Sequence, residues 1–269
     1  GAPMSRRIVG ELEVLSQEPE KRRFAAPLLF VHGAFAGAWV WDEHFLSWFA
    51  AQGFSAHAVS LRGHGGSAGH DRIDWHSVHD YVDDVAEVVG DLEAAPVLVG
   101  HSMGGFVVQK YLERHAVPAA VLMCSVPPQG LVAAQFSLLF EKPGMTMEIN
   151  RLLGGGDVPL DVLREALFAQ EVDDEKLRRY YRMMQPESQR AIWDMSVFGL
   201  PNLHAMQRPP LLVLGAEKDV LMPAFLVQST ARTYGVPDKI FRGMGHGLMV
   251  EKDWQHVAET MRDWLVETL

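Results

Sequence analysis

The chain has 269 residues, of which 48% are hydrophobic and 22% are charged, and its formal net charge is −10. This composition is that of an ordinary globular protein, and it excludes disordered, collagen-like and fibrous chains. An acidic chain without a basic block binds nucleic acid poorly, so no nucleic-acid partner is expected. The single cysteine, Cys124, has no second cysteine with which to form an internal disulfide.

No apolar run in the sequence reaches the roughly 18 residues that are needed to span a membrane. Residues 1–7 also lack the apolar stretch of a signal peptide. We therefore expect a protein that has no membrane span and is located in the cytoplasm.

Short apolar runs alternate with amphipathic stretches along most of the chain. This alternation predicts an α/β fold, in which helices flank a mostly parallel central sheet. Residues 7–15 are expected to form an N-terminal strand within a hairpin. Apolar residues at helical spacing predict helices at residues 82–92 and 254–265. The other expected strands, in chain order, are residues 27–31, 56–61, 96–100, 119–124, 210–215 and 239–242.

Residues 127–209 break this alternation because they contain helical patterns and no convincing strand. We interpret the segment as a helical cap that lies over the ends of the strands. The cap then divides a core domain into two parts, residues 4–126 and 210–269. The helical patterns within it cover residues 162–169, 175–184 and 188–198.

The strongest chemical signal is the G-x-S-x-G motif at residues 100–104, which lies between an apolar strand and a helix. A nucleophile in this position sits on a sharp, strained turn, and the glycines Gly100 and Gly104 remove clashes with the neighbouring strand and helix. The N-terminus of the following helix also favours developing negative charge. The motif therefore predicts that Ser102 is a catalytic nucleophile.

A serine hydroxyl is a weak nucleophile and needs a base, which in turn needs an orienting acid. Asp219 and His246 each follow an expected strand near the end of the chain, in the order known for α/β-hydrolases. Because ligands bind at the carboxyl edge of a parallel sheet, both side chains are expected near Ser102. Glu217 is a competing acid, but Asp219 is favoured because it lies within the turn before Pro223.

Acyl transfer also needs backbone donors for the oxyanion of the tetrahedral intermediate. The N–H of Met103, directly after the nucleophile, is one candidate. The N–H of Ala34 is the other, because Gly33 allows its loop to approach the site closely. His32 is expected at the substrate site, where it hydrogen-bonds within this loop rather than transferring protons.

Aromatic side chains near these motifs and in the cap are candidates for a largely apolar substrate pocket. No metal site is expected. Together with His32, the predicted substrate-binding residues are Phe35, Trp39, Phe136, Phe140 and Trp193.

Several segments together resemble the α/β-hydrolase superfamily, and the resemblance covers nearly the whole chain. It implies a triad of Ser102, Asp219 and His246, no cofactor, and a helical cap after the sixth strand. The matching segments are Val31-His32-Gly33-Ala34, Gly37-Ala38-Trp39-x-Trp41, Leu61-Arg62-Gly63-His64-Gly65-x-Ser67, Gly100-His101-Ser102-Met103-Gly104-Gly105, Gly215 with Asp219 and Pro223, and Gly245-His246.

The loop around Trp39 is similar to the branch of the superfamily that holds plant methyl esterases, hydroxynitrile lyases and related bacterial carboxylesterases. The lyases typically carry a threonine after the strand-end histidine and a lysine after the catalytic histidine. Gly33 and Gly247 stand at those positions here, which counts against cyanohydrin chemistry.

The sequence therefore predicts a serine hydrolase that cleaves a carboxylic ester of a small or medium, largely apolar substrate through an acyl-enzyme. Its expected partner is that small-molecule ester, and both a monomer and a homodimer are compatible with the sequence. Two alternatives stay open. The same fold could perform C–C bond cleavage, perhydrolysis or cofactor-free oxygenation, or it could serve as a ligand-binding receptor with slow turnover.

Overall fold

The structure is a computed structural model that describes residues 3–269. Within that range the strands form one eight-stranded sheet in the order β1-β2-β4-β3-β5-β6-β7-β8. β1 and β2 pair antiparallel at one edge, and β3 to β8 run parallel to one another, which confirms the α/β fold. The strands are β1 (Ser5–Val9), β2 (Leu12–Gln17), β3 (Leu28–Val31), β4 (Ala56–Val59), β5 (Val97–His101), β6 (Ala120–Met123), β7 (Leu211–Ala216) and β8 (Asp238–Phe241).

The burial of the strands explains their sequences. The strands β3 to β7 are buried along their whole length, and their apolar runs arise because helices cover both faces of the sheet. β8 lies at the edge and begins with two exposed residues, in keeping with its more polar sequence. The run at residues 7–15 is divided between two strands, because the chain turns at Gly10, whose φ is 62°.

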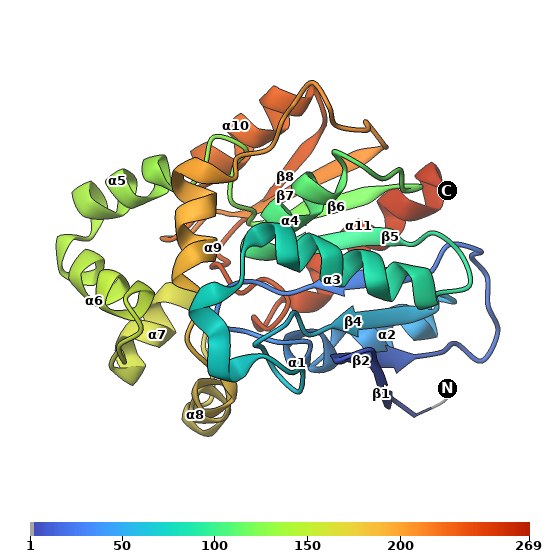
Figure 1. Ribbon diagram of the computed structural model, residues 1–269, viewed down its shortest axis with the longest axis horizontal. Coiled ribbons are helices and arrows are strands. Elements are labelled where there is room, and N and C mark those ends of the chain that lie inside the picture. The colour runs from blue at the N-terminus through green and yellow to red at the C-terminus, as the bar shows by residue number, and fades with distance from the viewer. Residues whose placement is uncertain (1–2) are drawn as a thin grey trace.

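Alternate residues of each strand face two different helical layers. In β3, Leu29 and Val31 pack into one layer, and Leu28 and Phe30 pack into the other. The first layer contains α3 (Val78–Asp91), α4 (Met103–Tyr111) and α10 (Ala224–Tyr234). The second contains α1 (Trp39–Asp42), α2 (Phe45–Ala51) and α11 (Trp254–Thr268). A 3-10 turn, η1 (His70–Trp75), precedes α3, which lies in front of the sheet in Figure 1.

The expected cap segment, residues 127–209, follows β6. All of its residues are described, and none lies in a strand. Both of its proposed boundaries fall in loops, and Figure 1 shows α5 to α8 gathered beyond one end of the sheet. The helices of the segment are α5 (Val132–Glu141), α6 (Pro143–Leu153), α7 (Leu160–Leu167), α8 (Asp174–Met183), α9 (Gln189–Trp193) and a π-helical turn, η2 (Asp194–Phe198).

The helices of residues 3–269 include none that is long and apolar enough to cross a membrane.

Candidate active site

Ser102 stands at the turn between β5 and α4, where its backbone adopts φ 54° and ψ −116°. Residues with a side chain rarely adopt positive φ, so this turn is strained and depends on its surroundings. A Cβ at Gly104 would overlap the carbonyl of Val31, and a Cβ at Gly100 would overlap the carbonyl of Gly104. The glycines of the motif therefore permit the close packing that the turn requires.

Asp219 and His246 lie side by side in the loops after β7 and β8. The Nδ1 atom of His246 is 2.7 Å from Oδ2 of Asp219, and both side chains are almost fully buried. The other carboxylate oxygen of Asp219 accepts hydrogen bonds from the N–H groups of Leu221 and Met222, each 2.9 Å long. With Nδ1 directed to the carboxylate, the proton-accepting nitrogen of His246 is Nε2, and His246 lines the same pocket as Ser102.

Glu217, the competing acid in the sequence, is directed elsewhere. Its side chain is exposed, and its Oε1 accepts a hydrogen bond of 2.9 Å from the N–H of Gly243. The structure therefore brings Asp219, and not Glu217, to His246.

Two residues that were not among the predicted site residues, His101 and Cys124, contact His246 and Asp219. His101 donates a hydrogen bond of 2.8 Å from Nε2 to the backbone carbonyl of His246. Burial and the nearby His246 lower the pKa of His101 to about 3, so the ring stays neutral and holds the His246 loop in place. Cys124 is fully buried, and burial together with Asp219, to which it hydrogen-bonds, raises the pKa of its thiol. The thiol is thus protonated, as expected of a small buried residue.

Within residues 3–269, one cluster of buried side chains brings three potential metal ligands close together. The ligand atoms of His101, Cys124 and His246 lie within 4.8 Å of one another. Nitrogens of both imidazoles are already engaged, one with the His246 carbonyl and the other with Asp219. These three side chains therefore belong to the hydrogen-bond network around Asp219.

The N–H groups of Ala34 and Met103 are the predicted oxyanion donors. Neither donates a hydrogen bond to another group within the described residues 3–269. Met103 is the first residue of α4, so its N–H lies at the positive end of that helix. A Cβ placed on Gly33 would lie 3.1 Å from the Cβ of Ser102, so the loop of Ala34 runs directly beside Ser102.

His32 fixes this loop from the core side. Its Nδ1 donates to the carbonyl of Gly33 at 2.8 Å, and its Nε2 accepts from the N–H of Leu61 at 3.0 Å. Because the peptide between Gly33 and Ala34 is trans, holding its carbonyl turns the N–H of Ala34 to the opposite side. His32 is completely buried and lines neither of the cavities beside Ser102, so the structure places it behind the loop and not in the pocket.

Ser102 lies where two apolar cavities meet, and Ala34, Phe35 and Leu221 also line both. Among residues 3–269, no Lys, Arg, Asp or Glu lines either cavity. The histidine-side cavity, of about 130 Å³, is lined by His246 and by side chains that include Trp39, Leu163, Ala166, Tyr180 and Val250. The methionine-side cavity, of about 110 Å³, is lined by Met103 and by side chains that include Ala134, Leu138, Ile192 and Met195.

The predicted aromatic pocket residues divide into two groups. Phe35 and Trp39 line the histidine-side cavity. Phe136, Phe140 and Trp193 line neither cavity, and 57%, 84% and 58% of their surfaces are exposed. The structure therefore places these three cap residues on the surface, outside both cavities beside Ser102.

The helical phase of α5 explains this difference. The helix has apolar residues on two faces, and the face that carries Ala134 and Leu138 is buried against the methionine-side cavity. Phe136 and Phe140 lie on the outward face. The spacing of four between Ala134 and Leu138 is a sequence signal of a buried face. Phe136 and Phe140 have the same spacing on the outward face, so the sequence does not show which face is buried.

Comparison with known protein families decides the classification. A family model described as "Alpha/beta hydrolase family" matches residues 28–260 of the 269. The chain belongs to the α/β-hydrolase family.

Relatives of this α/β-hydrolase include enzymes of more than one kind. A monoacylglycerol lipase of Mycolicibacterium smegmatis is 25% identical over 239 residues, which cover 84% of this chain and 83% of the lipase. A non-heme haloperoxidase of Rhodococcus erythropolis is 39% identical over 108 residues, but the match spans only 38% of each chain. An esterase structure from Exiguobacterium antarcticum covers 97% of this chain and 98% of its own, with a TM-score of 0.69 and 18% identity, a likeness of fold alone.

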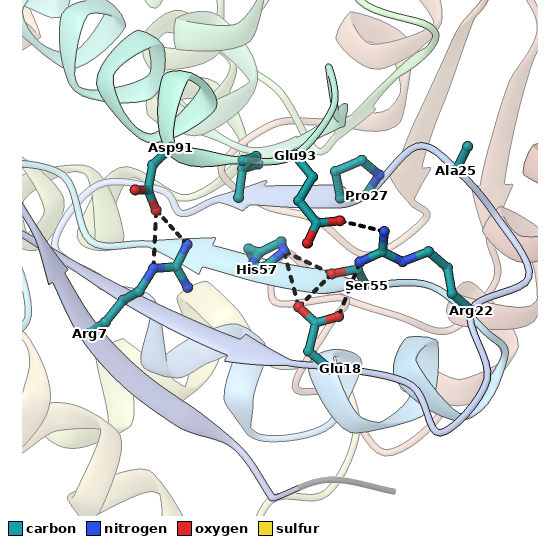
Figure 2. Close-up of a pocket in the computed structure, with 10 residues that line it drawn as sticks. Arg7, Glu18, Arg22, Ala25, Pro27, Ser55, His57, Asp91 and Glu93 are labelled. Atoms are coloured by element: carbon teal, nitrogen blue, oxygen red, sulfur yellow. Dashed lines mark hydrogen bonds and ion pairs between the residues drawn. The ribbon is translucent and has the colours of Figure 1, made fainter.

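This α/β-hydrolase also has a polar cavity of about 260 Å³, which is lined by Pro27 and Ser55 at the amino ends of β3 and β4, whereas Ser102 follows the carboxyl end of β5. Figure 2 shows that Arg7 points toward Asp91 and Arg22 toward Glu93. The guanidinium nitrogen to carboxylate oxygen distances are 2.9 and 2.5 Å. Because the charged groups on its walls pair with one another, we interpret this cavity as structural. The Arg7–Asp91 pair joins β1 to the end of α3, and the Arg22–Glu93 pair joins the segment after β2 to the segment after α3.

Proposed function

We propose that this α/β-hydrolase is a serine esterase that cleaves neutral carboxylic esters through an acyl-enzyme intermediate. One observation carries the proposal: Ser102 stands on a strained turn in the pocket of His246, whose Nδ1 is 2.7 Å from Asp219. A nucleophile, a base and an orienting acid in this order are the groups that acyl transfer needs. The monoacylglycerol lipase that matches most of the chain is consistent with such chemistry.

In the first half of the reaction, the Oγ atom of Ser102 attacks the ester carbonyl carbon, and its proton passes to Nε2 of His246. Asp219 holds the imidazole in the correct tautomer and stabilises the imidazolium that forms. The N–H groups of Ala34 and Met103 bind the oxyanion. His246 then gives its proton to the leaving alcohol, and the acyl group stays on Ser102.

In the second half, a water molecule attacks the acyl-enzyme while His246 takes a proton from it. The same two N–H groups bind the second oxyanion, and His246 returns the proton to Ser102 as the acid leaves. These steps use only groups of this chain and water.

The cavities indicate the class of substrate. Each is large enough for a small apolar group, and no charged side chain among residues 3–269 lines either of them. A charged substituent placed there would lose its hydration without gaining an ion pair, which costs several kcal/mol. We therefore propose a neutral ester with a small or medium apolar group on each side of the scissile bond.

A matched pair of substrates tests this proposal. The p-nitrophenyl esters of butyric acid and of succinic acid have acyl chains of equal length, but the second carries a carboxylate. We expect kcat/KM for the butyrate to exceed that for the succinate by at least about 100-fold, because burying the unpaired charge costs a few kcal/mol. The Ser102→Ala protein supplies the background rate.

Two results would count against the proposal. If wild-type protein cleaves neither ester faster than the Ser102→Ala protein, it is not a serine esterase for small esters. If both esters are cleaved equally well, the assignment of a neutral substrate is wrong.

A further inference from the structure

The carboxylate of Glu187, between α8 and α9, is the meeting point of four segments of the chain. Its Oε1 accepts hydrogen bonds from Nε2 of His64 at 2.8 Å and from the N–H of Phe35 at 3.2 Å. Its Oε2 accepts from the hydroxyl of Tyr81 at 2.6 Å and from the N–H of Ser188 at 2.9 Å. Only 1% of Glu187 is exposed, so these donors replace the water that the carboxylate would otherwise bind.

His64 and Glu187 form an ion pair whose side chains are fully buried. Nδ1 of His64 lies 2.8 Å from the carbonyl of Arg62, so both ring nitrogens face acceptors and both carry hydrogen. Burial acts to lower the pKa of His64, but the charge and hydrogen bond of Glu187, together with backbone hydrogen bonds to Arg62 and Leu61, raise it above the ordinary value. A buried ion pair often adds little stability over apolar residues of similar size, which points to a role for this pair other than stability.

The contact with Phe35 indicates such a role. Phe35 has a φ of 66°, in the left-handed region that side-chain-bearing residues avoid. The segment before α9 holds it from two sides, because Glu187 accepts its N–H and the N–H of Gln185 donates to its carbonyl at 3.4 Å. The side chain of Gln185 also donates to the carbonyl of Ala36 at 2.9 Å. These hydrogen bonds offset the unfavourable conformation of Phe35.

Phe35 follows Ala34, the second oxyanion donor, so its conformation bears on the site. The peptide before Ala34 is held from the core by His32, through the carbonyl of Gly33. The peptide after Ala34 is held by Glu187, through the N–H of Phe35. The two contacts together determine the direction in which the N–H of Ala34 points.

We propose that Glu187 is a positioning residue for the oxyanion hole, which it completes by holding Phe35 in its left-handed conformation. The inference rests on the proposed ester hydrolysis, because it concerns an oxyanion that forms during acyl transfer. It also assigns a catalytic purpose to the predicted cap, since a residue of that segment shapes the donor loop of the core.

Two double variants separate this role from the ion pair itself. His64→Leu with Glu187→Met replaces the pair by apolar residues of similar volume and removes the acceptor for Phe35. His64→Gln with Glu187→Gln also removes both charges but keeps a side-chain oxygen that can accept from Phe35. Neither variant leaves a buried charge unpaired, so both are expected to fold. Tyr81→Phe is the control, because it removes a donor from the other oxygen of Glu187 only.

The readouts are kcat and KM for p-nitrophenyl butyrate, together with the melting temperature. We expect the Leu/Met variant to lose about 10- to 100-fold in kcat with KM within about threefold, since a misdirected oxyanion donor weakens transition-state binding alone. The Gln/Gln variant is expected to recover kcat to within about fivefold of wild type, in line with a retained acceptor. Tyr81→Phe is expected to lower the melting temperature without changing kcat.

The proposal is overturned if the Leu/Met variant, folded by its melting transition, keeps wild-type kcat. It is also overturned if the Leu/Met and Gln/Gln variants lose kcat equally, because the ion pair would then matter and the acceptor would not. Wild-type protein that cleaves no ester faster than the Ser102→Ala protein contradicts the proposed function instead. The two failures are therefore distinguishable.

Discussion

Replacing Asp219 by asparagine is expected to lower kcat for ester hydrolysis by about 10⁴-fold, as the loss of the correct histidine tautomer does in a serine protease. The reason lies in the hydrogen bonds of the carboxylate. One oxygen accepts from the N–H groups of Leu221 and Met222, so these donors will also hold the amide oxygen of the asparagine. The amide NH₂ must then face Nδ1 of His246.

An NH₂ group in that position donates to Nδ1 and places the ring hydrogen on Nε2. His246 can then no longer accept the proton of Ser102. Glu217→Gln is the matched control, because Glu217 is exposed and its Oε1 contacts the N–H of Gly243 rather than His246. Steady-state kinetics and melting temperatures of both variants test this account. A loss below tenfold for Asp219→Asn, or an equal loss for Glu217→Gln, would show that Asp219 does not orient the base.

Acidification from pH 7 to pH 5 is expected to lower the free energy of unfolding by about 5 kcal/mol. Burial lowers the pKa of His32 and of His101 to about 3, and that of His57 to about 4. In the unfolded chain each ring takes up a proton near pH 6.5. Each histidine therefore stabilises the fold fully above pH 6.5, and this contribution falls by about 1.4 kcal/mol per pH unit toward the folded pKa.

The pKa of His64 is shifted in the opposite direction, but this shift does not cancel the loss of stability on acidification. Its pKa is raised in the folded state, so its contribution is fully present below pH 6.5 and is lost only as the pH rises through its folded pKa. Urea unfolding at pH 7 and pH 5 measures the effect. A His57→Gln variant should lose about 2 kcal/mol less than wild type between these pH values, because one titrating ring is gone. Equal stability at both pH values would contradict the assignment of three neutral buried rings.

The parts of the fold that could be predicted are those whose structure is determined by residues close together in the sequence. The apolar runs of β3 and β5 reflect burial on both faces of the sheet, and that burial is what the structure shows. Gly100 and Gly104 signal the turn at Ser102 because no side chain fits where the backbones meet. Asp219 and His246 could be placed near Ser102 because parallel strands share a carboxyl edge.

The parts that could not be predicted depend on contacts between distant segments. Glu187 meets Phe35 across 152 positions of sequence, and nothing near either residue indicates the contact. His101 donates to the carbonyl of His246 across 145 positions of sequence. His101 is the first x of the G-x-S-x-G motif, where any residue is allowed, so the motif does not indicate this contact. The position of the cap residues could not be predicted for another reason. The sequence of α5 is apolar on two faces, and only packing decides that Ala134 faces inward while Phe140 does not.

The measurement that tests the central proposal most directly is capture of the acyl-enzyme. Wild-type protein is mixed with p-nitrophenyl butyrate, quenched in acid during the first turnovers, and examined by intact mass and peptide mapping. We predict a butyryl adduct on the peptide that contains Ser102, and no adduct on the Ser102→Ala protein. Ester turnover without any acylated protein, or an adduct on another residue such as Cys124, would contradict the account.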